Sequence, residues 1–269
     1  ISVKYNSTYG DKLITPTWAG YVFGGWYTEK YAVGANVDET KKVDANTTFS
    51  VTDDDTVLYA YWTPRTDIKV TLDVNATAAT GETVTLDPTT ITVTYLGEYT
   101  SLPTPTWTGH VFQGWYTLAE GGTRVNNSDT VEITDSTTLH AHWKLETYTV
   151  TLDHNNDDET PANSTKTDIT VTYSMTYSDL PELTREGYTF GGWYTEKYGV
   201  NAVVDAAKKI EKTTTVNTDA ERTLYAYWTY NQYTVHFDAN GWGVTVPADQ
   251  TFLYAVAQKL TKMPGSSTG

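Results

Sequence analysis

Short stretches in which apolar and polar residues alternate recur along the chain and predict β-strands. Three copies read IKVTLD (68–73), YTVTLD (148–153) and YTVHFD (233–238). Because successive side chains of a strand point to opposite faces, this alternation is typical of a strand with one buried face. A second set follows the same rule: ISVKY (1–5), ITVTY (91–95), ITVTY (169–173) and the weaker TFLY (251–254). The pattern predicts two strands at the start of each repeating unit.

A glycine-rich aromatic motif also recurs and poses the main functional question. It reads GYVFGGWYT at 20–28, GHVFQGWYT at 109–117 and GYTFGGWYT at 187–195. Such a motif could stack a sugar, cradle a phosphate, or build the core of a module. Phe23 and Trp26 would face opposite sides of a regular strand, so we predict a β-bulge at the glycine pair. No GKS or GKT sequence follows, which excludes a phosphate loop of that type. We interpret the motif as a core signature.

A second aromatic motif predicts the last strand of each unit. It reads LYAYW, LHAHW and LYAYW, and it ends at Trp62, Trp143 and Trp228. The leucine, alanine and tryptophan share one strand face in all copies, whereas the residues between them vary, so we assign the constant face to the core. His140 and His142 share the variable face and could hold zinc. Their counterparts are tyrosines and no third ligand is evident, so we predict no metal there.

The order of these signals divides the chain into four repeats. We predict a partial repeat without its first strand at 1–62, complete repeats at 63–143 and 144–228, and a partial repeat with two strands at 229–269. The terms first to fourth repeat refer to these ranges. The sequence is expected to be a segment of a longer array, and the uneven spacing between units indicates insertions in loops between fixed strands.

The composition of the chain mainly excludes classes of chemistry and of partner. The 269 residues carry a formal net charge of −15 and contain no cysteine, which rules out disulfides and thiol chemistry. A polyanion repels nucleic acid phosphates and anionic lipid headgroups, so we expect no nucleic acid partner and no membrane insertion of this segment. No arrangement of side chains is typical of nucleophilic or acid–base catalysis. We therefore predict no enzyme activity and no cofactor.

The paired motifs GYTFGGWYT and LYAYW, preceded by strand, leucine and proline signals, resemble the Listeria–Bacteroides repeat, also called the internalin B-repeat. The resemblance covers essentially the whole chain. It implies small β-grasp-like modules, similar to ubiquitin-like folds, strung in tandem in large bacterial surface proteins. It also implies adhesion or display roles and no catalytic residues. We expect a mainly β fold (α+β, β-grasp-like modules), tandem repeats arranged as an elongated rod, and an extracellular or cell-surface location. The long first hairpin at 73–90 departs from the family pattern.

Two functions stay open on this basis. The first is a stalk or adhesive rod in surface display, adhesion or an extracellular filament, with neighbouring repeats of a longer chain as partners. The second is a module that binds carbohydrate or a host protein through exposed aromatic side chains. The candidates are Trp18 and Trp107, which occupy equivalent positions in PTWAG and PTWTG. Arg185 takes that position in the third repeat, which indicates an exposed or junction position.

An acidic stretch offers a weak calcium candidate. DHNNDDE (153–159) has oxygen-bearing side chains at alternate positions: Asp153, Asn155, Asp157 and Glu159. A calcium loop of the EF-hand type needs a glycine at its sixth position, where this chain has Asp158, and a glutamate at its twelfth, which is missing. We therefore favour a solvated acidic hairpin loop without a structural metal.

Glycosylation sequons occur at Asn6, Asn46, Asn75, Asn126 and Asn163. The abundance of threonine makes chance matches to the N-x-S/T pattern expected, and use of the sites depends on the host.

Overall fold

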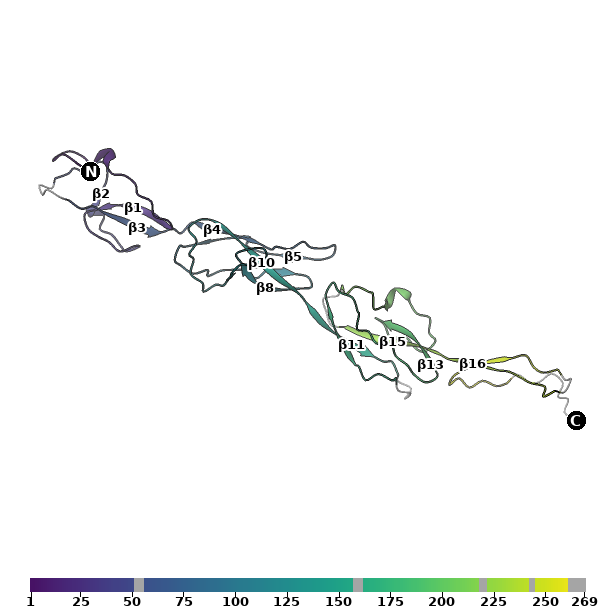
Figure 1. Cartoon of the computed structure of the whole chain (residues 1–269). Coiled ribbons are helices and arrows are strands. Elements are labelled where there is room, and N and C mark those ends of the chain that lie inside the picture. The colour runs from purple at the N-terminus through teal and green to yellow at the C-terminus, as the bar shows by residue number, and fades with distance from the viewer. Residues whose placement is uncertain (51–55, 157–161, 218–221, 242–244, 261–269) are drawn as a thin grey trace. The chain divides into compact units, whose positions relative to one another are not determined.

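The computed structural model describes residues 1–50, 56–156, 162–217, 222–241 and 245–260 (Figure 1). The chain forms two compact units, Ile1–Lys144 and Leu145–Gly269, and each is described by itself. Within the described ranges, helical structure is limited to three short 3-10 helices: η1 (Gly10–Lys12), η2 (Glu39–Lys41) and η3 (Ala206–Lys208). The remaining regular structure is β-strand, which confirms the mainly β part of the expected fold class.

The first sheet of the N-terminal unit belongs to the first repeat. Its strands are β1 (Tyr21–Tyr27), β2 (Lys42–Val43) and β3 (Tyr59–Pro64), in the order β2-β1-β3 and all antiparallel. The glycine-rich motif forms β1, and the LYAYW motif leads into β3. The two aromatic motifs are therefore neighbours in the sheet, as expected if they share a core.

The second sheet of this unit belongs to the second repeat. Its strands are β4 (Ile68–Asp73), β5 (Val84–Thr85), β6 (Thr90–Val93), β7 (Thr106–Trp107), β8 (His110–Tyr116), β9 (Arg124–Val125) and β10 (Thr137–Leu145). Their order is β5-β7-β8-β10-β4-β6, and β9 also pairs antiparallel with β8, at Trp115 and Tyr116. β4 and β10 run parallel, whereas β4 and β6 run antiparallel.

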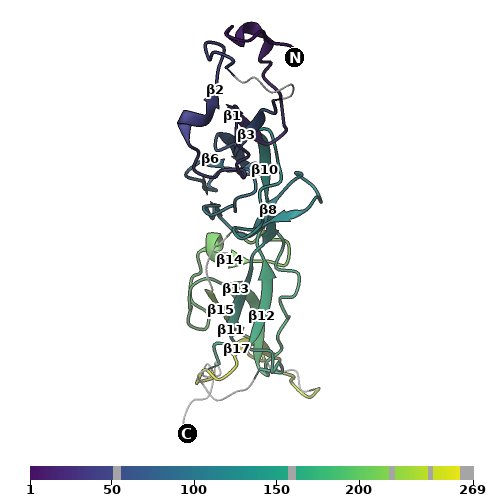
Figure 2. The ribbon, with the colours of Figure 1, turned by 90° about the vertical axis from the view of Figure 1, so that its left-hand side faces the viewer.

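The C-terminal unit repeats this order in the third repeat. Its main strands are β11 (Thr147–Asp153), β12 (Asp168–Thr172), β13 (Tyr188–Tyr194), β14 (Lys209–Ile210) and β15 (Arg222–Tyr230). Their order is β12-β11-β15-β13-β14, with β11 and β15 parallel (Figure 2). In the fourth repeat, β16 (Gln232–Val235) and β17 (Gln250–Leu253) form an antiparallel pair. The predicted pairs of early strands are therefore present in repeats two to four.

The apolar faces of the sheets form the cores. Strand β4 alternates buried and exposed residues along its whole length, as its sequence predicts. Trp115 and Trp193 are each only 2% exposed, and Trp228 is fully buried. Each indole N–H of the glycine-rich motif donates to a backbone carbonyl twelve residues earlier, as Trp115 does to Pro103 at 2.8 Å. This hydrogen bond removes the cost of burying the polar edge of the ring.

The first repeat departs from the predicted core. Trp26 and Trp62 are only half-buried. The reason lies in the sheet, because β3 is its outermost strand, whereas β10 and β15 are covered on that side by β4 and β11. The tryptophan of the glycine-rich motif is therefore buried in the two repeats whose first strand is present, as Trp115 and Trp193 show, whereas Trp143 stays half-buried although β4 covers β10.

The predicted β-bulge is present in the strand of the glycine-rich motif. The register between β1 and β3 shifts between Phe23 and Gly25, and the same shift separates Phe190 from Gly192 in β13. Gly25 has a φ of 130°, a conformation that side chains disfavour. A Cβ atom there would lie 2.8 Å from Cε of Lys42. The glycine before the tryptophan is thus favoured by its backbone conformation, whereas the flexible end of the Lys42 side chain could move away from a Cβ atom.

Candidate functional site

Trp18 lies in an aromatic cluster of the first repeat and is partly open to solvent. Its ring stacks on Tyr21 at a centroid distance of 4.0 Å and meets the edge of Trp62 at 5.6 Å. The side chain is nevertheless 48% exposed. Stacking fixes the orientation of the indole at little further entropic cost, which leaves an ordered aromatic surface available to another molecule.

Trp107 occupies the same place in the second repeat but is more fully engaged. It stacks on His110 at 3.5 Å with an interplanar angle of 7°, and it meets the edge of Trp143 at 5.6 Å. Its indole N–H donates a 2.9 Å hydrogen bond to Glu82. Trp107 is half-buried as a result, and it offers less free surface than Trp18 does.

Arg185 corrects the interpretation of this position in the third repeat. The sequence left two alternatives for this position, exposed or at a junction, and exposure is wrong for Arg185, which is only 5% exposed. Its guanidinium carbon lies 3.9 Å from the centre of the Tyr188 ring and 5.6 Å from that of Trp228. A guanidinium is planar and stacks on aromatic rings much as an indole does. Tryptophan and arginine interchange because both provide a flat group for the same stack.

The calcium candidates Asp153 and Asn155 form a structural corner. Asn155 has a φ of 50°, and its backbone N–H donates to Asp153 at 2.8 Å. Its side-chain amide donates to the carbonyl oxygens of Tyr198 and Ala226, at 2.7 and 2.9 Å. The other two candidates, Asp157 and Glu159, lie outside the described residues. Over the described ranges, no three acidic or histidine side chains gather as metal ligands would.

The same corner recurs in the second repeat around Asn75. Its amide donates to the carbonyl oxygens of Ala119 and Ala141, at 2.9 and 3.1 Å. The carbonyl of Val74 accepts the indole N–H of Trp143 at 2.8 Å. The corner ties the end of the first strand to the last strand and to the loop after the glycine-rich motif. The recurring D-x-N sequence at 73–75, 153–155 and 238–240 is the signal that could have predicted it.

His140 and His142 are used within the second repeat. His140 lies 3.0 Å from Asp73, and His142 bonds the carbonyl oxygen of Leu118 and stacks on Tyr116 at 3.9 Å. The two rings thus have separate partners and do not converge on one point.

The resolved pKa shifts of buried groups fall on core tyrosines. Burial raises the pKa of Tyr9 and Tyr227, and burial together with the nearby Asp129 carboxylate raises the pKa of Tyr99. These phenols therefore stay neutral across the physiological range. Shifts of this kind are a consequence of burial and do not create an acid or base that works near neutral pH.

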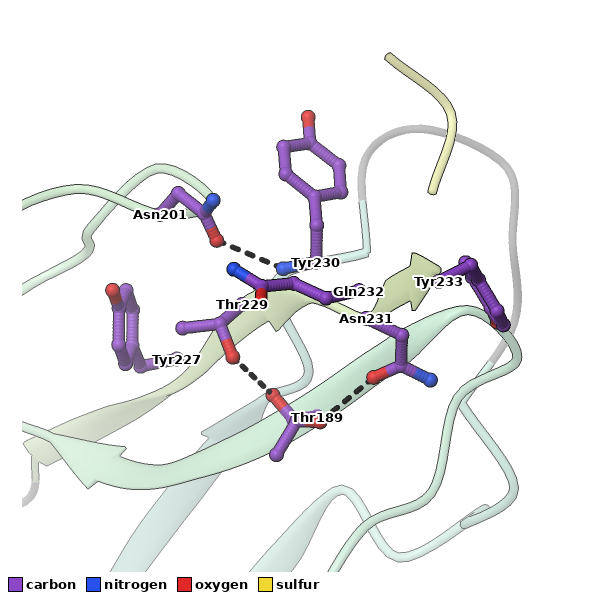
Figure 3. A pocket seen from close by; sticks show the side chains of 8 residues that line it. All are labelled: Thr189, Asn201, Tyr227, Thr229, Tyr230, Asn231, Gln232 and Tyr233. Carbon is purple, nitrogen blue, oxygen red and sulfur yellow. Dashed lines mark hydrogen bonds between the residues drawn. The ribbon is translucent and has the colours of Figure 1, made fainter. Parts of the chain in front are cut away.

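An open polar hollow of about 680 Å³ lies in the C-terminal unit where the third repeat continues into the fourth (Figure 3). All eight side chains that line it carry hydroxyl, amide or phenol groups, and none is charged. Sequence reasoning missed this hollow because its residues come from β13, from the loop before η3, from β15 and from β16, and no local motif joins them.

These features define a class of protein: a tandem of small, mainly β repeats with aromatic cores. The Listeria-Bacteroides repeat domain matches the chain three times, at residues 2–61, 70–142 and 148–227. The chain therefore belongs to the Listeria-Bacteroides repeat family, as the paired aromatic motifs indicated. Among the described residues, no helix is long and apolar enough to cross a lipid bilayer.

Curated relatives share the repeat over different lengths. A protein of Evansella cellulosilytica described as a Gly-rich membrane protein is 26% identical over 258 residues, which are 96% of this chain and 26% of that protein. A second membrane protein of that organism is 25% identical over 240 residues, or 89% of this chain and 31% of the relative. Internalin H of Listeria monocytogenes is 33% identical over 95 residues, covering 35% of this chain and 16% of internalin H. The chain thus spans less than a third of each of these relatives. No solved structure matches it.

Proposed function

We propose that this chain is a non-enzymatic stalk or adhesive rod within a bacterial cell-surface protein. The observation that carries the proposal is an ordered junction between consecutive repeats, seen once inside each compact unit. A rod needs such junctions, because repeats joined by free linkers would move independently.

The junction of the N-terminal unit joins the first and second repeats through Arg65. The backbone N–H of Arg65 donates to Gly20 at 2.9 Å, and its carbonyl accepts from the N–H of Tyr95 at 2.8 Å. The Tyr95 ring packs directly on Gly20, where a Cβ atom would lie 2.6 Å from the ring, and it meets the edge of Tyr21 at 5.2 Å. The Arg65 guanidinium also bonds the carbonyl of Thr134 at 2.7 Å. The linker is therefore held by both repeats.

The junction of the C-terminal unit joins the third and fourth repeats in the same way. The N–H of Asn231 donates to Gly187 at 2.9 Å, and the N–H of Tyr254 donates to Asn231 at 3.0 Å. The Tyr254 ring packs on Gly187 and meets the edge of Tyr188 at 5.5 Å. Two copies with the same hydrogen bonds support a junction that is part of the repeat itself.

The order of the strands supports the assignment of each complete repeat to a β-grasp-like module. In the second and third repeats the first and last strands lie side by side and parallel, flanked by the second strand and the glycine-rich strand. This order fits the β-grasp-like module that we propose for each complete repeat. The surface location is supported by family membership and by the relatives described as membrane proteins or an internalin.

Small-angle scattering of the full chain tests the rod. We expect an elongated particle. When Gly20 and Gly187 are both changed to valine, its longest dimension should become shorter or more widely distributed, because the valine side chains take the space in which the tyrosine rings pack. A matched control is Gly81→Val, since nothing lies within 4 Å of a Cβ at that hairpin position. A compact particle for the unaltered chain, or no change in the double variant, would contradict the proposal.

The second candidate function is binding of carbohydrate or a host protein through aromatic side chains. Its support is the ordered and 48% exposed ring of Trp18, with the half-buried Trp107 as the weaker candidate. A glycan-array screen of the full chain with Trp18→Ala and Trp107→Ala tests it. Binding that disappears with Trp18→Ala while the fold is retained would support this function.

A further inference from the structure

The polar hollow of the C-terminal unit has an ordered wall. Thr189 donates from its hydroxyl to the side-chain oxygen of Asn231 at 2.7 Å, and the backbone N–H of Tyr230 donates to the side-chain oxygen of Asn201 at 2.8 Å (Figure 3). Both asparagine amides are therefore fixed by their oxygen ends. In the described part of the chain, no hydrogen bond uses their NH₂ groups or the side chain of Gln232.

Aromatic rings flank these amides. Tyr233 is 50% exposed and Tyr230 is half-exposed, and in Figure 3 the Tyr230 ring stands above Gln232 and the Tyr233 ring lies beside Asn231. The hollow thus combines amide donors and acceptors with apolar ring faces. Its volume of about 680 Å³ can hold several sugar rings.

We propose that this hollow, called here the amide groove, binds a neutral carbohydrate. Sugar hydroxyls both donate and accept hydrogen bonds, as the amides of Asn201, Asn231 and Gln232 do. The C–H faces of a sugar ring pack on aromatic rings such as those of Tyr230 and Tyr233. An anionic ligand is disfavoured because the lining has no cation and the chain carries a net charge of −15.

The first repeat provides an internal comparison. Gly34 corresponds to Asn201, because the N–H of each donates to the carbonyl of the repeat's last tryptophan, Trp62 or Trp228. Both residues have positive φ, at 69° and 58°, and asparagine tolerates that conformation. The last residue of β3 and the linker after it are Pro64, Arg65 and Thr66, in place of Tyr230, Asn231 and Gln232. The backbone conformation at this position is therefore shared, but the first repeat and the linker that follows it lack the amides and the ring.

The groove is separate from the aromatic positions of the second candidate function. Trp18 and Trp107 belong to the N-terminal unit, whereas every residue that lines the groove lies in the C-terminal unit. The groove does not depend on the rod proposal, and either can fail without the other.

NMR titration of the full chain with four defined probes tests the proposal. The neutral probes are cellotetraose, chitotetraose and mannotetraose, and the anionic probe is tetragalacturonate. We expect at least one neutral probe to shift the side-chain NH₂ signals of Asn201, Asn231 and Gln232. The changes Gln232→Ala and Tyr233→Ala should each weaken its binding about fivefold to tenfold, since each removes one contact from an exposed side chain.

The control variant is Thr66→Ala, at the position that corresponds to Gln232 in the junction of the N-terminal unit. It should leave the affinity unchanged. The proposal is overturned if no neutral probe shifts these signals at millimolar concentration, if only tetragalacturonate does, or if Gln232→Ala and Tyr233→Ala bind as the unaltered chain does.

Discussion

Replacing Trp115 by alanine tests whether the glycine-rich motif is a core or a binding site. Trp115 is 2% exposed, packs edge-on against Phe112 at 5.5 Å, and bonds the Pro103 carbonyl at 2.8 Å. Truncation opens a cavity and leaves that carbonyl without its donor. Comparable tryptophan-to-alanine changes cost about 3–5 kcal/mol, which is a large part of the stability of a small module.

Trp107→Ala is the matched comparison within the same repeat. It removes the stack on His110 and the hydrogen bond to Glu82 from a half-buried position. A loss of about 1–2 kcal/mol is expected from those two interactions.

Amide hydrogen exchange on the full chain measures both variants locally, because it reports opening of individual strands. Protection of Val70 and Leu139, which pack in the core of the second repeat, should fall strongly in Trp115→Ala and slightly in Trp107→Ala. Strands of the third repeat should keep their protection and serve as the control. A Trp115→Ala variant with unchanged protection would show that a binding site was mistaken for a core.

Three further predictions concern the D-x-N corner and its surroundings. Thermal melting of the full chain should give nearly the same midpoint in calcium and in chelator. A large calcium-dependent rise of the midpoint would indicate a calcium site, with residues 153–159 as the first candidates. Asn155→Ala removes two hydrogen bonds to backbone carbonyls and should destabilise the third repeat by about 2–3 kcal/mol in hydrogen exchange, whereas loss of only a few tenths would refute the structural role. In a glycosylating host, mass spectrometry should find Asn46, which is exposed, modified in preference to Asn75, whose amide nitrogen already donates two hydrogen bonds. Equal occupancy of the two sequons would contradict that expectation.

Periodicity predicted most of the strands because alternation is a local property of the backbone, but the strand predicted at ISVKY (1–5) is wrong, since the first strand of the chain is β1. IKVTLD and YTVTLD became β4 and β11 with the expected buried faces. The β-bulge could be predicted because Phe23 and Trp26 would face opposite sides of a regular strand. The repeat boundaries stay a prediction, as do the ligand roles of Trp18 and Trp107.

Other features depended on contacts that one segment cannot reveal. Arginine at position 185 suggested exposure because its charge was considered without the rings of Tyr188 and Trp228 that surround it. Trp26 was assigned to a closed core, but its burial depends on a strand from another part of the repeat. The amide groove joins Thr189, Asn201 and the segment 229–233, whose proximity only the folded sheet establishes.

The parallel pairing of first and last strands has a mechanical consequence. In the third repeat the chain enters at the start of β11 and leaves at the end of β15, and the two strands pair from Val150 with Arg222 to Asp153 with Tyr225. Because parallel strands point the same way, these two points lie at opposite ends of the pair. Tension applied through the backbone therefore acts along the strands and shears all of their hydrogen bonds together instead of peeling them off one at a time. A repeat with this strand arrangement resists pulling because the hydrogen bonds between its first and last strands must break in a single event.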